Sequence, residues 1–287
     1  MVQPRSEGPP ALLWVEQDDW RDPPRSLQRL RKRRSLHRHR SVALLQRGQY
    51  VCQTLDAPAD LDRADWAAAV RWQLKDLVDF PVDGAAVDVL AVPEGTSYRA
   101  QPQLIAVAAA EAQVRPLVGQ AHAAGVPWTA IDIAETALRN LGSRVAPAGR
   151  AQALLHCQAS HATLVVTWGE ELLSTRQFDI TLEQLSSDDE ASRQRSHDQV
   201  GLELQRTLDG IERAYGQVTL ARVLVTPMPG VQALTEHLGP LLYVPVLPLD
   251  LGELLDLSAV PELAGDALAL NRALLAIGAA LREEGPD

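Results

Sequence analysis

The sequence predicts a two-lobed α/β protein with mixed sheets, and three observations support this prediction. Each half of the chain opens with antiparallel strands and then alternates strands with helices, once from Ser41 and again from Ala151. The breaker segment Pro147-Ala148-Gly149 separates the two halves. A length of 287 residues can bury the cores of two domains. We therefore expect a basic irregular arm over 1–40, a first domain over 41–148 and a second domain over 149–287.

In the first half, hydrophobic periodicity and breakers predict the elements after an irregular start. Pro9, Pro10, Pro23 and Pro24 interrupt residues 1–40, so only a short strand within 11–15 is left open there. The stripe of Trp66, Val70, Leu74, Leu77 and Val78 predicts a helix over 62–79, with Pro81 beyond its end. The other predicted elements are strands at 41–46, 49–55, 86–92, 103–108 and 128–133, and helices at 109–124 and 134–141.

In the second half, three strands precede a long helix, and helices then alternate with strands. The strands are predicted at 151–156, 163–168 and 172–179, before a polar run over 186–195. Val200, Leu204, Leu208, Ile211 and Tyr215 form the buried stripe of the long helix. A strand at 222–226, a helix at 231–238, a strand at 242–246 and a final helix at 262–282 complete the prediction.

The charge of the chain is unevenly distributed. The formal net charge is -10, yet residues 25–40 hold eight Lys or Arg and no acid, while the remainder carries 19 basic against 37 acidic side chains. An acidic body does not attract nucleic acid. Two interpretations of Arg31, Lys32, Arg33 and Arg34 stay open, a solvated charge run and a contact with an anionic membrane surface.

Known catalytic and metal-binding motifs are missing from the sequence. Cys52 and Cys157 stand alone in strand-like runs, which indicates two buried, reduced thiols. His156 and His161 flank a predicted turn without a third ligand at fitting spacing, so no metal is expected. Asp132 is expected to cap a helix. No phosphate-loop, dinucleotide or hydrolase motif and no signal or membrane span is found, so a soluble, cytoplasmic protein is expected.

Four segments, taken in order, carry a family resemblance. They are residues 70–83 with Phe80-Pro81, residues 125–141 with Ala130-Ile131-Asp132-Ile133, residues 202–217 with Leu208-Asp209, and residues 276–282. In this order they resemble the actin-like cytoplasmic proteins of type IV pilus assembly, in particular the MshI branch of the mannose-sensitive haemagglutinin (MSHA) system and the PilM branch. The resemblance implies an actin-like (ribonuclease H-like) ATPase fold over roughly residues 41–282.

The same resemblance implies that the phosphate loops are degenerate. The hairpin of such ATPases carries Asp-x-Gly, whereas His156 and Gln158 stand at the matching positions here. A glycine run is replaced by Thr226-Pro227-Met228-Pro229-Gly230, and no glycine occurs between Ser35 and Ser41. Residues that could still touch a nucleotide are Gln158, Ser160, Thr226 and Gly230. No enzymatic activity and no cofactor are expected, and ATP with magnesium is the less favoured alternative, ahead of a sugar or acetate kinase.

The resemblance also implies partners for a non-catalytic adaptor peripheral to the inner membrane. These are the cytoplasmic tail of a single-span protein, PilN-like or MshJ-like, and the assembly ATPase. Trp72 lies about 240° from Trp66 around the predicted helix, off the buried stripe. It either fills a neighbouring groove or anchors a partner peptide together with Phe80 and Pro81. The alternative function is a nucleotide-binding actin-like ATPase of a pilus or type II secretion platform.

Overall fold

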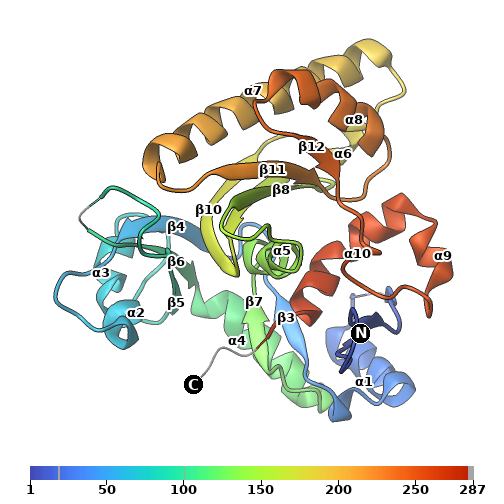
Figure 1. Cartoon of the computed structure of the whole chain (residues 1–287). Helices are drawn as coiled ribbons and strands as arrows, with labels where there is room; N and C mark the ends of the chain where they lie inside the picture. The colour runs from blue at the N-terminus through green and yellow to red at the C-terminus, as the bar shows by residue number, and fades with distance from the viewer. Residues whose placement is uncertain (19, 100, 284–287) are drawn as a thin grey trace. The chain divides into compact units, whose positions relative to one another are not determined.

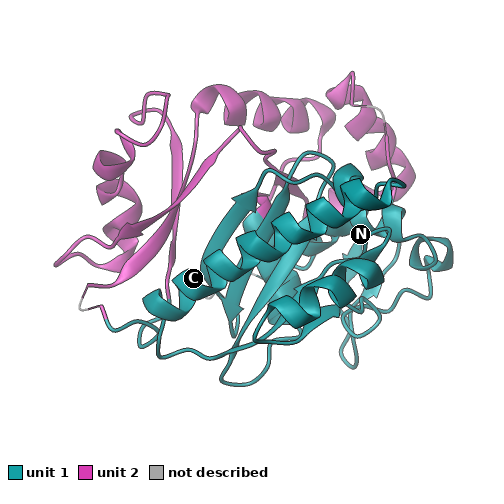
Figure 2. Ribbon diagram, turned by 90° about the horizontal axis from the view of Figure 1, so that it is seen from above, with its two compact units in different colours: residues 1–15, 93–98, 135–287 teal, residues 16–92, 99–134 magenta. Residues whose placement is uncertain are grey.

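The computed structural model describes residues 1–18, 20–99 and 101–283. The chain divides into two compact units, shown in separate colours in Figure 2. Unit 1 comprises residues 1–15, 93–98 and the chain from residue 135, and unit 2 comprises residues 16–92 and 99–134. This division differs from the expected one, because residues 135–148 belong to the same compact unit as the second half of the chain.

A five-stranded mixed sheet forms the centre of unit 1 (Figure 1). Its order is β10-β9-β8-β11-β12, with antiparallel pairing among β8, β9 and β10 and parallel pairing of β11 with β8 and β12. Apolar runs buried on both faces explain why β8 and β9 lie at the centre of the core. The strands are β8 (Ala151–Cys157), β9 (Ala162–Trp168), β10 (Glu171–Phe178), β11 (Leu220–Val225) and β12 (Val246–Pro248).

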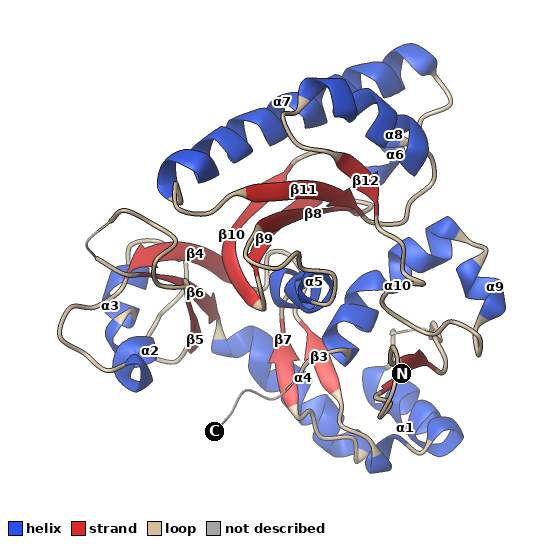
Figure 3. Cartoon of the chain, viewed as in Figure 1, coloured by secondary structure: helices blue, strands red, loops and turns tan. Residues whose placement is uncertain are grey.

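Helices cover both faces of this sheet. In Figures 1 and 3 the helices α7 and α8 lie along one face, and α5 lies on the other. The stripe of α7 is confirmed, since Val200, Leu204 and Leu208 are fully buried. The helices of this part of the chain are α5 (Ala134–Ser143), α6 (Leu182–Leu185), α7 (Glu190–Ala214), α8 (Val231–Leu238), η3 (Gly239–Leu241), α9 (Pro261–Ala264) and α10 (Ala267–Ala280).

Helix α10 crosses α5 at Gly278, where the two backbones touch. A Cβ atom on Gly278 would overlap the carbonyl oxygen of Ala137 in α5. The amide of Asn140, one turn further along α5, donates to the carbonyl oxygen of Gly278 at 3.0 Å. This close approach requires glycine on α10 for steric reasons and not for its backbone freedom.

Unit 2 contains, in its described residues, two smaller sheets, one of three strands and one of two. The strand β6 (Gln103–Ala109) lies between β4 (Val51–Asp56) and β5 (Ala86–Ala91), antiparallel to both. The strands β3 (Val42–Leu44) and β7 (Ala130–Asp132) pair in parallel. The helices are α1 (Pro23–Arg34), η1 (Leu36–Arg38), η2 (Arg63–Asp65), α2 (Trp66–Ala69), α3 (Arg71–Leu74) and α4 (Glu111–Ala124).

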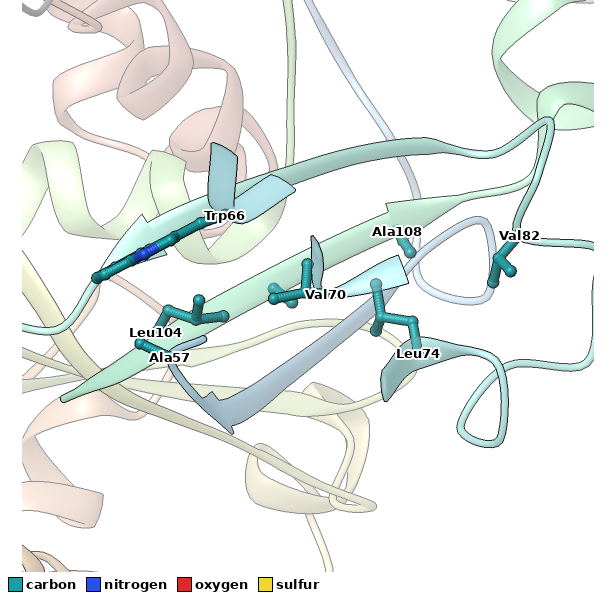
Figure 4. Close-up of a cluster of buried hydrophobic side chains, with 8 residues drawn as sticks. Ala57, Trp66, Val70, Leu74, Val82, Leu104 and Ala108 are labelled. Atoms are coloured by element: carbon teal, nitrogen blue, oxygen red, sulfur yellow. The ribbon is translucent and has the colours of Figure 1, made fainter. Parts of the chain in front are cut away.

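Two of the predicted helices are interrupted in the structure. The helix expected over 62–79 is divided into η2, α2 and α3, although Trp66, Val70 and Leu74 are buried together with Leu104 as predicted (Figure 4). Leu77 is exposed, so it does not belong to the stripe. The final helix is divided at Gly265 into α9 and α10, because Asp266 caps a new helix by accepting from the amides of Leu268 and Ala269.

The prediction of an irregular arm over residues 1–40 is wrong. Residues 23–34 form α1, which begins with Pro23 and Pro24 in its first turn, and it buries Leu27 against Ala121 and Ala124 of α4. Ahead of it, β1 (Val2–Gln3) pairs with β2 (Ala11–Leu12). The strand expected at 242–246 is also displaced and becomes β12. None of the helices in the described part of the chain is long and apolar enough to span a lipid bilayer.

We predict that Gly278→Ala lowers the free energy of unfolding by about 1–3 kcal/mol, because α5 and α10 must move apart to admit a methyl group. Gly210→Ala is the matched control, since Gly210 lies in α7 and a methyl group placed on it would have no neighbour within 4 Å. The free energy of unfolding of this control variant should stay unchanged or rise by up to about 1 kcal/mol. Urea denaturation of both variants measures this difference. An equal loss of stability in both would contradict the close contact between α10 and α5 at Gly278.

Candidate functional site

The turn between β8 and β9 is held together by its own side chains. The backbone amide of Gln158 donates to the carbonyl oxygen of His161 at 2.8 Å. The two side chains also meet, with Gln158 Nε2 3.2 Å from His161 Nε2, and Ser160 Oγ lies 2.9 Å from His161 Nδ1. The predicted residues Gln158 and Ser160 are therefore brought together, and both are hydrogen-bonded to the imidazole of His161.

His156 connects this hairpin to the segment that follows β11. Its Nδ1 lies 2.9 Å from the Oγ1 of Thr226, and the ring is buried. Burial, reinforced by the neighbouring His161, lowers the pKa of the His156 imidazole to about 3. The His156 ring is therefore neutral at physiological pH.

The segment from Thr226 to Gly230 is fixed from two sides. The Thr226 backbone amide donates to the Leu155 carbonyl oxygen at 3.0 Å. Asn271 of α10 donates to the carbonyl oxygens of Cys157 at 3.0 Å and Pro227 at 2.9 Å, joining the hairpin to this segment. Gly230 has φ of 75° and precedes α8, a conformation that favours glycine. Sequence reasoning missed Asn271, because nothing in a helix sequence shows which carbonyls its amide reaches.

The expectation for the first phosphate element is wrong in its placement. The opening strand β3 is followed by a turn at residues 46–49, in which Gly48 has φ of 85° and the Gln49 amide donates to the Gln46 carbonyl oxygen at 2.9 Å. A glycine-containing turn therefore does follow the opening strand. The segment between Ser35 and Ser41 lies one element earlier, since it follows α1 and contains the short η1.

The Trp72 surface, which we define as Trp72, Phe80 and Pro81, lies in unit 2. The Trp72 side chain is 78% exposed, with Lys75 Nζ 5.8 Å from its ring centroid, so it is not buried within unit 2. Pro81 is exposed, while Phe80 is half-buried against the core that contains Trp66. The neighbouring Arg71 donates to the carbonyl oxygens of Val82 at 2.7 Å and Ala85 at 2.9 Å, which fixes the turn before β5.

Part of the basic stretch on α1 is neutralised within the protein. Arg33 and Arg34 both pair with Glu16, and the Arg34 pair measures 3.1 Å. The Arg31 guanidinium lies beside Gly125 at the end of α4, where the helix dipole favours a cation. Of the four predicted membrane residues, Arg31 and Lys32 are exposed and form no ion pair with a described residue.

Metal binding finds no support in this arrangement. Among the described residues, no group of three or more His, Cys, Asp or Glu side chains could hold a metal ion. His156 and His161 instead make the hydrogen bonds given above. Burial raises the pKa of the Cys157 thiol to about 12, so this side chain is an unreactive part of the core.

Comparison of the sequence with protein-family models and with curated proteins gives no match. Solved structures are similar in fold. The PilM-PilN type IV pilus biogenesis complex contains a chain that is 20% identical over 97% of this chain and 94% of that one, with a TM-score of 0.66. This chain has the actin-like ATPase fold.

Two further structures are less similar. One is a Bacteroides thetaiotaomicron protein with an actin-like ATPase fold, 10% identical over 90% of this chain and 87% of that one, with a TM-score of 0.47. The other is the cytoplasmic domain of EpsL, an inner-membrane component of the Vibrio cholerae type II secretion system, 12% identical over 79% and 82%, with a TM-score of 0.44.

We predict that the neutral, buried His156 makes stability depend on pH. The unfolded state takes up this proton near pH 6.5, whereas the folded state takes it up only near pH 3. The free energy of unfolding therefore falls by about 1.4 kcal/mol per pH unit as pH decreases between these values. His156→Gln should show a shallower decline in urea denaturation from pH 7 to 4, while the exposed His122→Gln should follow the wild type. Identical slopes for all three proteins would contradict the assignment.

Proposed function

We propose that this protein is a cytoplasmic adaptor of a type IV pilus assembly platform that holds the tail of an inner-membrane partner. The observation that carries the proposal is the similarity to the PilM-PilN complex along 97% of this chain. The relative in that structure is seen with a PilN partner, so a PilN-like tail is the ligand that we propose here. The four segments that resemble the pilus assembly family support the same proposal from the sequence.

Within this proposal, the MSHA system is the branch that the sequence segments favour. The protein would then take the MshI place and bind a MshJ-like tail, at the inner face of the membrane and in contact with the assembly ATPase. The alternative is a nucleotide-binding actin-like ATPase of a pilus or type II secretion platform. The glycine-containing turn at 46–49 favours this alternative.

We further propose that the protein does not hydrolyse ATP, for reasons that lie in two loops. The hairpin offers a neutral His156 where a carboxylate is needed, and Thr226 is hydrogen-bonded to that ring. Pro227 and Pro229 have no amide hydrogen to donate to a phosphate. The side chains that would face a phosphate are thus engaged with each other, which favours a scaffold over an enzyme.

Purified protein is predicted to release phosphate from Mg-ATP no faster than buffer does. Weak nucleotide binding without turnover is compatible with this prediction, so the measurement must be of released phosphate over hours. A protein in which Gln158→Ala and Ser160→Ala are combined is the control for contaminating ATPases. Turnover in the wild type that this double variant abolishes would overturn the proposal.

The Trp72 surface is the site that we propose for the partner tail. An aromatic side chain with this exposure has most of its apolar area available to a partner. Arg71 holds the adjoining turn through two hydrogen bonds, so Trp72 and Pro81 stand on a fixed support. Fixed aromatic anchors are typical centres of binding energy in interfaces.

Trp72→Ala is predicted to weaken binding of a synthetic PilN-like tail by about 1–3 kcal/mol while leaving the melting temperature nearly unchanged. Trp66→Ala is the contrasting variant, because Trp66 is buried and its Nε1 donates to the Leu61 carbonyl oxygen at 3.1 Å. It should lower stability by about 3 kcal/mol or more. The idea fails if Trp72→Ala unfolds the protein or leaves the affinity in a calorimetric titration unchanged.

The membrane contact is a separate, smaller part of the proposal. Because Arg33 and Arg34 pair with Glu16, and Arg31 lies against the end of α4, the exposed Lys32 and Arg38 of η1 are the cations that we test for contact with anionic lipid. Combining Lys32→Gln with Arg38→Gln should reduce sedimentation with phosphatidylglycerol vesicles at low salt. The control removes the same charge from α7 through Arg195→Gln and Arg206→Gln, and equal sedimentation of the two proteins would refute the contact.

A further inference from the structure

The outer edge of β5 presents backbone groups that no described strand pairs with. The Val92 amide donates to the Gln103 carbonyl oxygen at 3.0 Å, which fixes the phase of the antiparallel ladder between β5 and β6. Because hydrogen bonding alternates along such a ladder, the amides of Val87, Val89 and Ala91 point away from β6. Sheet order places β5 at the edge, with β6 as its one paired strand among the described residues.

One of these outward amides is occupied by a side chain. The Val89 amide donates to Oδ1 of Asp88, its neighbour in the strand, at 2.8 Å. Asp88 is exposed, and a charged residue at such a position discourages pairing with an unselected strand. This hydrogen bond joins adjacent residues on the protein surface. A backbone carbonyl of a bound tail can therefore replace the Asp88 carboxylate as its acceptor.

We propose that the partner tail binds by adding a strand to the outer edge of β5, where its backbone pairs with Val87, Val89 and Ala91. This inference rests on the proposed function, and it adds the mode of recognition and the chemistry of the tail. Edge addition gives affinity through main-chain hydrogen bonds, and side chains at alternate positions give specificity.

The location of the Trp72 surface fits this mode. Arg71 of α3 bonds to the carbonyls of Val82 and Ala85, and β5 begins at Ala86. Trp72 is therefore next in sequence to a residue that is hydrogen-bonded to the segment leading into β5. A tail that lies along β5 can continue toward Pro81 and Trp72, where one of its apolar side chains contacts the Trp72 ring.

The charge around the edge indicates a basic tail. Residues 56–92 contain eight Asp and three Lys or Arg, and Arg71 among these is engaged with backbone carbonyls. Asp88 lies on the strand itself, and Asp79 and Asp83 lie in the segment before it. Cytoplasmic segments beside a membrane span carry an excess of Lys and Arg, which matches this acidic surface.

The test is a scan of the synthetic PilN-like tail with single N-methylated backbone amides, titrated against the full-length protein. Strand addition predicts that methylation at alternate residues weakens binding about tenfold, while the residues between them tolerate it. A loss that shows no alternation along the peptide, or no loss at any position, would overturn the inference.

Two protein variants test the same edge from the other side. Ala91→Pro removes an outward amide from a small residue and leaves the ladder to β6 intact, so it should weaken binding about tenfold at an unchanged melting temperature. Asp88→Asn should weaken binding at low salt and flatten its salt dependence. Asp188→Asn, which removes the same charge from unit 1, should not.

These outcomes separate the inference from the proposed function. Absence of any tail binding overturns the adaptor function and the strand addition together, whereas binding that ignores Trp72→Ala but shows the alternation and the effect of Ala91→Pro overturns the Trp72 site alone. Binding that depends on Trp72 but shows neither the alternation nor an effect of Ala91→Pro overturns strand addition alone. Alternation with no effect of Asp88→Asn overturns the basic character of the tail.

Discussion

The side-chain amide of Asn271 is the interaction on which the candidate site in unit 1 depends. It reaches from α10 to the carbonyl oxygens of Cys157 and Pro227, one from each loop, and it is itself buried. Buried carbonyls that lose their donors cost about 1–3 kcal/mol each, so the two loops are held at this spacing by one residue. The position of Asn271 depends in turn on Gly278, which lets α10 lie directly against α5.

A helix that fixes both loops also determines what they can do. With Asn271 in place, Thr226 meets His156 and the turn closes over His161, so the polar side chains have found partners inside the protein. A phosphate would have to compete with these bonds and would meet a neutral imidazole. These internal hydrogen bonds hold the two loops in one arrangement.

Much of the fold could be predicted because its signals are local. The strands β8 and β9 follow from continuous apolar runs, and α7 from one stripe at helical spacing. The helix in the N-terminal segment could not be predicted in the same way, because α1 depends on Leu27 reaching α4 and on ion pairs with Glu16 outside the helix. The bonds made by Asn271 and Arg71 were missed for the same reason, since long side chains reach carbonyls that no sequence spacing reveals.

The neighbouring residues Arg71 and Trp72 of unit 2 differ in what their side chains contact. Arg71 is used for structure, holding two carbonyls ahead of β5, while Trp72 on the same short helix remains 78% exposed. Rigidity in one residue reduces the conformational entropy that the other loses on binding. An exposed Trp on a mobile segment would lose more freedom for the same contact. The support given by Arg71 is therefore the physical reason why we propose Trp72 as the anchor for a partner.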